Sequence, residues 1–235
     1  MRILAVDTTT RSCSVAVAEN STVLGEITNI SDQTHSRHLL DLIHTVIQDA
    51  GLTLSALDGF AVTRGPGSFT GLRIGMSSVK GLALAANKPV VGISSLETLA
   101  QQMTPTSNLI CPLIDARKGE IYSAVFRFDT EGLTPALEES VSAPDEMLQN
   151  IHGPCIFVGS GAVLYRDLII DRLGDLACIA SQERHIIQAS TVAYLALKRF
   201  ESGVAGEVAD LVPYYIRQSD AELNFKRHHA KLQRR

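Results

Sequence analysis

The chain has 235 residues, 45% of them hydrophobic, and a formal net charge of −4. This length suits one large domain or two small ones, and the composition excludes a disordered chain. No apolar run approaches the roughly 20 residues of a membrane helix, and the first residues lack a signal-peptide pattern, so we expect a cytoplasmic protein without membrane contact.

Strands and helices alternate along the first half of the sequence. Three strands are predicted over residues 3–7, 12–18 and 23–28, separated by polar turns. A helix is predicted over about 35–50, with Thr34 as its N-cap and Gly51 just beyond its end. Then follow a buried strand over 59–63, a glycine-rich turn, a helix over 72–86, a strand over 90–94 and a helix over 96–103.

The second half repeats this order after a linker at residues 104–108. Its predicted strands cover 109–115, 121–128, 136–141 and 155–158, and its helices cover 144–150, 164–173 and 191–202. Both halves open with a strand that ends in aspartate (Asp7 and Asp115), a polar turn and a second strand. We therefore expect an α/β protein of two ribonuclease-H-like lobes, as in actin-type ATPases, each a mixed sheet flanked by helices.

The predicted organisation has three parts. Residues 1–105 form the first lobe and residues 106–216 the second, whose last helices could pack back on the first lobe. Residues 217–235 form a basic tail. From Arg217 to the end there are six basic and two acidic residues, which leaves a net charge of −8 for the rest of the chain. Such a tail suits a polyanion, and a solvated chain end is the alternative interpretation.

Asp7 is a candidate ligand residue. In actin-type ATPases an aspartate at such a strand end flanks a magnesium–phosphate group, and the adjoining turn needs glycine for close backbone approach. Here the turn is Thr8-Thr9-Thr10, with the β-branched Thr9 where glycine is expected. The alternative for Asp7 is a role in capping the turn. None of the four cysteines forms a Cys-x-x-Cys motif, and each is expected to be a small core side chain.

The segment Arg64–Gly75 lies between a strand and a helix, where anions often bind. It lacks the Gly-Lys-Ser/Thr of a Walker A loop, its glycine spacing is one residue too long for a dinucleotide fingerprint, and it does not match a nucleophile elbow. Arg73 stays a candidate anion contact. The glycines favour a packing or partner-docking role, because they cost helix stability unless another backbone comes close.

Two helices carry more apolar surface than a single sheet requires. In the helix over 72–86, an apolar stripe that includes Leu72, Met76 and Val79 lies beside a stripe of small residues that includes Gly75. In the helix over 35–50, Leu39, Leu42, Ile43 and Val46 belong to an apolar arc of roughly 160°. These faces could cover the chain's own sheet or bind a partner, and both alternatives stay open on periodicity alone.

The turn between the first two strands of the second lobe concentrates charge. Arg117, Lys118 and Glu120 lie there, between Asp115 and Tyr122. A charged hairpin turn is usually plain surface. At the edge between two lobes, the same residues could bind a ligand or dock a partner.

Several of these segments together resemble the bacterial TsaB (YeaZ) family. The resemblance covers nearly the whole chain, and its most specific motif is Arg64–Gly75. The other matching segments are Asp7–Thr9, Lys80–Ala83, Asp115–Tyr122, Val158–Gly161 and Pro213–Arg217.

The resemblance implies a role in forming threonylcarbamoyladenosine at position 37 of tRNAs that read codons beginning with A. Family members are noncatalytic partners of the related transferase TsaD, and the ATPase TsaE completes the assembly. They pair through the two first-lobe helices, as homodimers or with TsaD. This implies that the partner-binding residues are Leu39, Leu42, Ile43, Val46, Leu72, Gly75, Met76 and Val79.

The sequence departs from TsaD at the metal site. TsaD carries a His-x-x-x-His pair after the strand that matches residues 90–94, and the matching positions here are Ser95 and Leu99. Neither side chain replaces imidazole as a ligand. We therefore expect no catalytic residue, metal or cofactor. The alternative is a nucleotide hydrolase or a glycoprotease-type metalloenzyme, and a third possibility is weak tRNA binding by the tail.

Overall fold

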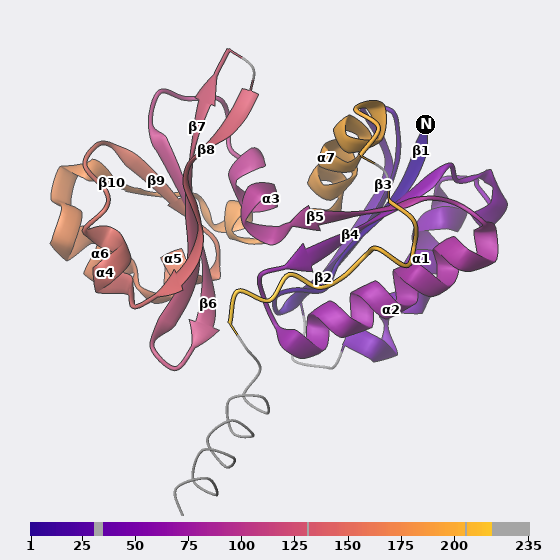
Figure 1. Cartoon of the computed structure of the whole chain (residues 1–235), viewed down its shortest axis with the longest axis horizontal. Coiled ribbons are helices and arrows are strands. Elements are labelled where there is room, and N and C mark those ends of the chain that lie inside the picture. The colour runs from indigo at the N-terminus through magenta and orange to yellow at the C-terminus, as the bar shows by residue number, and fades with distance from the viewer. Residues whose placement is uncertain (31–34, 131, 205, 218–235) are drawn as a thin grey trace, which may run out of the picture.

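The computed structural model describes residues 1–30, 35–130, 132–204 and 206–217. Each half of the chain forms a five-stranded mixed sheet, and the two sheets lie side by side (Figure 1). The first sheet contains β1 (Arg2–Asp7), β2 (Ser12–Glu19), β3 (Thr22–Ile30), β4 (Gly59–Gly65) and β5 (Val90–Ser94). The second contains β6 (Leu109–Arg117), β7 (Glu120–Asp129), β8 (Gly132–Ser142), β9 (Cys155–Val158) and β10 (Ala177–Ile179).

The two sheets share one topology. The strand order is β3-β2-β1-β4-β5 in the first and β10-β9-β6-β7-β8 in the second. In each, three consecutive strands pair antiparallel and two later strands join in parallel, so reading the second order backwards reproduces the first. This confirms the predicted pair of ribonuclease-H-like lobes.

Helices cover both faces of the first sheet because its central strand is apolar throughout. Along β1, Ile3 and Ala5 belong to one buried cluster and Leu4 and Val6 to another, as the two-residue period of a strand requires. The second of these clusters lies under α1 (Leu39–Asp49) and α2 (Phe69–Ala86). The first lies under α3 (Ser95–Gln101) and α7 (Ala189–Glu201), and it continues into the second sheet, so one core joins the lobes.

The helix α7 packs on the first sheet although it follows the second sheet in sequence (Figure 1). Its N-terminus is anchored there, because Ala189 donates a backbone hydrogen bond to Ser14 Oγ (3.0 Å) and Ser190 bonds the Glu26 carboxylate. The outer face of the second sheet is covered by α4 (Pro144–Leu148), α5 (Ser160–Leu164) and α6 (Arg166–Leu173). None of the helices in the described part of the chain is long and apolar enough to cross a membrane.

The segment after α7, residues 206–217, is called here the C-terminal strap. Gly206 bridges to Val90 on β5, and the Tyr214 N–H donates to the Arg64 carbonyl (2.8 Å) at the end of β4. Arg217 then reaches the second lobe, where it pairs with Glu120 at 2.8 Å. The strap therefore links the edge of the first sheet to the β6–β7 hairpin, as its yellow trace in Figure 1 shows.

Both first-lobe helices start at residues other than those predicted. The helix α1 begins at Leu39, after a short 3-10 turn at His35–Arg37, and the predicted N-cap Thr34 lies outside the described residues. The helix α2 begins at Phe69, three residues early, because the Ser68 side chain accepts a hydrogen bond from the Gly71 N–H (3.3 Å). Serine is a favoured N-cap residue, so Ser68 could have indicated this earlier start of the helix.

Three details of the second lobe also differ from the prediction. The helix predicted over 164–173 is two short helices, α5 and α6, which meet at Tyr165. The strand β10 was not predicted, because three residues at a sheet edge leave little pattern. Cys178 on that edge strand is exposed, whereas the other three cysteines are buried as expected.

Candidate functional site

The turn between β1 and β2 holds one carboxylate oxygen of Asp7 by hydrogen bonds within the chain. Asp7 is fully buried, and its Oδ1 accepts hydrogen bonds from the hydroxyls of Thr9 and Thr63 (2.6 Å each) and from the Thr9 N–H. The Thr8 hydroxyl donates to the Gly71 carbonyl (2.7 Å) on α2. Asp7 Oδ1 therefore caps its own turn.

The start of α2 fills the space beside this turn. A Cβ atom on Gly67 would lie 2.5 Å from the Thr9 carbonyl oxygen, and one on Gly71 would lie 1.9 Å from the Thr8 carbonyl oxygen. A Cβ on Gly75 would lie 2.3 Å from Thr8 Oγ1. The glycines of Arg64–Gly75 thus allow close approach to the chain's own backbone, at the position where an actin-type ATPase would hold phosphate.

The helix α3 closes the same region from the other side. Ser95 and Leu99, one helical turn apart, are both buried, and Ser95 Oγ donates to Thr9 Oγ1 (3.2 Å). Leu99 belongs to the core that joins the two lobes. A hydroxyl and an apolar side chain therefore occupy the two positions at which the resemblance led us to look for metal-binding histidines. Among the described residues, no group of three or more His, Cys, Asp or Glu side chains is placed to hold a metal.

The glycine turn of the second lobe is closed in a similar way. A Cβ on Gly159 would lie 2.4 Å from the Leu113 carbonyl oxygen, and the Gly159 N–H donates to His185 Nδ1 (3.0 Å). Because Nδ1 accepts this bond, Nε2 carries the proton and donates to the Ala180 carbonyl oxygen (3.0 Å). Burial lowers the pKa of His185, whereas its two backbone hydrogen bonds and the charge of Glu183 oppose this shift.

This arrangement predicts a stability change in mildly acidic solution. The pKa of His185 is lowered in the folded state, so below about pH 6.5 the unfolded chain binds the proton first and folding loses free energy. The loss should be less than about 1 kcal/mol at pH 5.5, because His185 is partly exposed and solvent screens its charge.

Urea unfolding of wild type and of His185→Asn at pH 7.5 and 5.5 measures this effect. Asparagine keeps an acceptor near the Gly159 N–H but does not titrate. The variant should lose less stability than wild type between the two pH values. An equal loss in both proteins would contradict the role given to His185.

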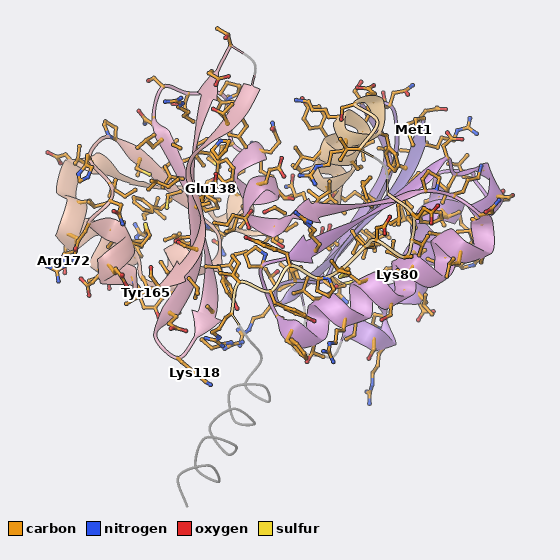
Figure 2. The ribbon with its side chains drawn as sticks, viewed as in Figure 1. Met1, Lys80, Lys118, Glu138, Tyr165 and Arg172 are labelled. Carbon is orange, nitrogen blue, oxygen red and sulfur yellow. The ribbon has the colours of Figure 1, made fainter. Side chains whose placement is uncertain are left out.

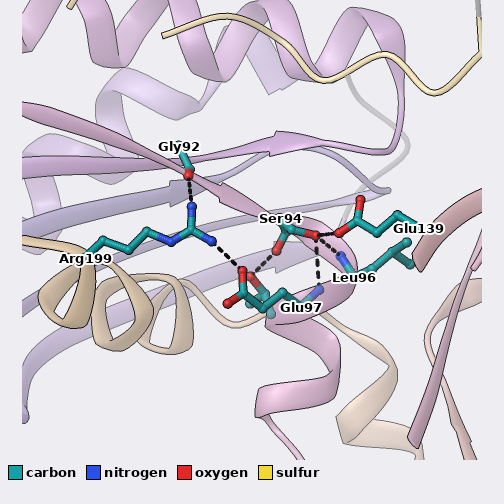
Figure 3. A network of polar contacts seen from close by, with 7 residues as sticks. Gly92, Ser94, Leu96, Glu97, Glu139 and Arg199 are labelled. Atoms are coloured by element: carbon teal, nitrogen blue, oxygen red, sulfur yellow. Dashed lines mark hydrogen bonds and ion pairs between the residues drawn. The ribbon is translucent and has the colours of Figure 1, made fainter. Parts of the chain in front are cut away.

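A polar network connects the lobes at the start of α3 (Figure 3). Ser94 Oγ, the N-cap of α3, donates to Glu139 on β8 and accepts from the N–H groups of Leu96 and Glu97 (3.1 Å each). Arg199 on α7 donates to the Gly92 carbonyl oxygen (2.7 Å) and pairs with Glu97 (2.6 Å). Burial raises the pKa of Glu139, and the hydrogen bond from Ser94 opposes this shift.

Two of the predicted junction residues, Arg73 and Glu120, contact the C-terminal strap. Arg73 on α2 donates to the Tyr215 hydroxyl (3.3 Å), and its guanidinium lies 3.9 Å from the centroid of the Phe69 ring. Glu120 pairs with Arg217. At the tip of the β6–β7 hairpin, Arg117 and Lys118 have left-handed backbones (φ 64° and 57°) and exposed side chains. The strap therefore brings Arg73 near the hairpin, whereas Asp7 is buried in its turn.

The side chains predicted to bind a partner mostly face the chain's own core. Seven of the eight are buried, and Leu42 is half-buried. The buried seven are Leu39, Ile43, Val46, Leu72, Gly75, Met76 and Val79. These side chains hold α1 and α2 on the first sheet and are not surface contacts in this structure. Periodicity identified the apolar face of each helix correctly but could not tell what covers it.

The outward faces of the same helices form a groove of about 460 Å³. It lies between the start of α1 and the first half of α2, and its lining includes Leu40, Phe69, Arg73 and Ile74. Leu40 is 59% exposed, and farther along α2 Leu84 is 67% exposed. Gly81 and Ala85 are exposed too, and a Cβ on Gly81 would meet nothing within 4 Å. This half-apolar surface with small residues can accept another helix at close range.

Comparisons with known proteins agree with this geometry. A family model described as "TsaD: tRNA N6-adenosine threonylcarbamoyltransferase" matches residues 20–225. The protein named "tRNA threonylcarbamoyladenosine biosynthesis protein TsaB" is 32% identical in Bacillus subtilis and in Escherichia coli, and each match covers 94% of this chain and 96% of the relative. The chain belongs to the TsaB (YeaZ) family.

Solved structures lead to the same family. YeaZ from Pseudomonas aeruginosa superimposes with a TM-score of 0.77 at 28% identity, over 91% of this chain and 99% of the other. A second structure from that organism, described as similar to peptidase YEAZ, has a TM-score of 0.79. The ethanolamine utilization protein EutJ from Carboxydothermus hydrogenoformans shares only the fold, with a TM-score of 0.53 at 10% identity.

Several residues of the site were missed at the sequence level. Tyr215 and Phe69 stack with ring centroids 5.1 Å apart, although 146 positions separate them in sequence. Glu139 and His185 also form hydrogen bonds with residues distant in sequence, Ser94 and Gly159. Long-range pairs of this kind leave no periodic signal. Leu40 did carry a signal, because it belongs to the apolar arc predicted for its helix.

Proposed function

We propose that this chain is a noncatalytic scaffold subunit for forming threonylcarbamoyladenosine at position 37 of tRNAs that read codons beginning with A. It acts in the cytoplasm by binding and stabilising the transferase TsaD, together with the ATPase TsaE. Family membership supports the pathway. The β1–β2 turn supports the noncatalytic role, because α2 and Ser95 occupy the space beside Asp7 in which a ligand would bind.

The observation that carries the partner role is the exposed groove between α1 and α2. Its apolar side chains and the small residues Gly81 and Ala85 suit a pair of helices from a related fold. TsaD would present such helices, because the family model that matches this chain bears its name. A second copy of this chain would use the same surface, so the homodimer and the complex with TsaD would exclude each other.

Size-exclusion chromatography of the purified chain mixed with TsaD tests this proposal. We expect a shared peak at the heterodimer mass and a rise in transferase activity when TsaE is added. Separate peaks, with TsaD activity unchanged by this chain, would overturn the scaffold role.

The alternative enzyme, a nucleotide hydrolase or a metalloprotease, gains no support from the site. The hydroxyl groups of Thr8 and Thr9 are already bonded within the chain, and the TsaD histidine positions hold Ser95 and Leu99. Calorimetry of the isolated chain with Mg-ATP and with zinc distinguishes the two functions. Tight binding of either ligand would favour the enzyme over the scaffold.

A further inference from the structure

Exposed aromatic rings and arginines gather where the C-terminal strap crosses the start of α2. Phe69 and Tyr215 stack at 5.1 Å with their planes 28° apart, and they are 37% and 40% exposed. Arg73 lies over the Phe69 ring and donates to the Tyr215 hydroxyl. Tyr214, also exposed, lies under the Arg64 guanidinium. Partly exposed rings held flat by arginines form a platform on which a further planar group can stack.

Basic groups continue from this platform into the second lobe. Arg217 is only two residues after Tyr215, so their Cα atoms are at most about 7 Å apart. Arg217 pairs with Glu120 at the tip of the β6–β7 hairpin, where Glu120 lies opposite Arg117 and next to the turn that contains Lys118. The Arg117 side chain is 71% exposed and lies 3.7 Å from Asp115. Lys118 projects from the tip, away from both sheets (Figure 2).

The charge of this surface opposes that of the whole protein. Arg73, Arg117, Lys118 and Arg217 outnumber the nearby carboxylates Asp115 and Glu120, whereas the chain as a whole carries −4. Stacking rings beside a local positive charge are the combination that binds single-stranded nucleic acid, with bases on the rings and phosphates on the cations.

We propose that the Phe69–Tyr215 platform and the basic hairpin tip form a contact surface for a single-stranded RNA loop. This inference rests on the proposed function, because the substrate of that pathway is a tRNA whose modified base lies in such a loop. The local positive charge favours RNA over a protein partner. The platform adjoins the α1–α2 groove and shares Phe69 and Arg73 with its lining. The surface holds the RNA while the partner enzyme performs the reaction.

The test measures binding of a fluorescently labelled anticodon stem-loop RNA by the chain alone and by its mixture with TsaD. Tyr215→Ala should weaken binding about 5- to 150-fold, the range for losing one stacked base, and Tyr215→Phe should restore most of it. The double variant Arg117→Asn, Lys118→Asn removes two phosphate contacts. It should reduce the magnitude of the slope of log K against log salt concentration by about 1.4. Asparagine suits the left-handed backbone at these positions.

Matched controls come from α6 and α7, outside both the platform and the hairpin. Tyr194 on α7 is 37% exposed and has Lys198 within 4.6 Å of its ring, so Tyr194→Ala removes a similar pair elsewhere. Arg166→Ala with Lys198→Ala removes two charges away from the hairpin. Neither control should change RNA binding. A fully paired RNA duplex of two strands should bind more weakly than the anticodon stem-loop.

The outcomes separate this inference from the proposed function. If the chain alone binds the RNA and the Tyr215 and hairpin variants weaken it, the RNA surface stands even where no complex with TsaD forms. If the complex forms but these variants bind RNA like wild type, the RNA surface is wrong and the scaffold role is unaffected. If Tyr215→Ala instead releases TsaD without changing RNA binding, the platform is a protein interface and the inference is overturned.

Discussion

Replacing Gly71 with alanine is expected to cost about 3 kcal/mol of folding free energy, or to prevent folding. The added Cβ would lie 1.9 Å from the Thr8 carbonyl oxygen, which is backbone and cannot rotate away. The helix α2 would have to move off the β1–β2 turn, and the hydrogen bond from Thr8 Oγ1 to the Gly71 carbonyl would be lost. Urea unfolding followed by circular dichroism measures the change.

The control for this prediction lies on the same helix. A Cβ on Gly81 would meet nothing within 4 Å, so Gly81→Ala should stabilise the protein by up to about 1 kcal/mol through helix propensity. The two substitutions are chemically identical and should act in opposite directions. Similar stability for Gly71→Ala and wild type would show that the contact between α2 and the turn is looser than the structure indicates.

Replacing Leu40 with aspartate is expected to weaken binding to TsaD by about 30-fold or more, because a charge would enter the centre of an apolar contact. Folding should be little affected, since Leu40 is 59% exposed and an acidic residue in the first turn of a helix is favourable. Titration calorimetry with TsaD measures affinity, and a thermal melt of the same sample reports folding.

Leu164→Asp is the matched control for the groove. Leu164 ends α5 in the second lobe and is 58% exposed, nearly the same as Leu40. We expect this variant to bind TsaD like wild type. If Leu40→Asp binds TsaD normally and Leu164→Asp does not, the partner surface lies on the second lobe and the prediction is wrong.

The fold could be predicted well because its signals are local. The buried run at Ile3–Val6, with Asp7 at the end of β1 and Asp115 near the end of β6, marks the first strand of each lobe. Sequence patterns fail where two distant segments decide the outcome. The turn glycines Gly67, Gly71 and Gly75 indicated a close backbone approach, but which backbone approaches depends on how β1 and α2 meet in space.

The candidate site was predicted only in part for the same reason. Arg73, Arg117 and Glu120 were identified from charge and position, but the strap that connects Arg73 to Tyr215 and Glu120 to Arg217 comes from the end of the chain. The eight partner residues illustrate a different limit. An apolar face predicts burial, and here the chain's own sheet buries Leu72, Met76 and Val79.

The return of α7 to the first sheet affects how the protein is made. One face of that sheet, with Ile3, Ala5 and Ala16, is covered by a helix that ends at Glu201, almost two hundred residues later. During synthesis this face therefore leaves the ribosome before the helix that covers it exists. The first half cannot fold as an independent unit ahead of the second, as domains commonly do. Folding must close a loop nearly as long as the chain, and such long-range contacts make it slow.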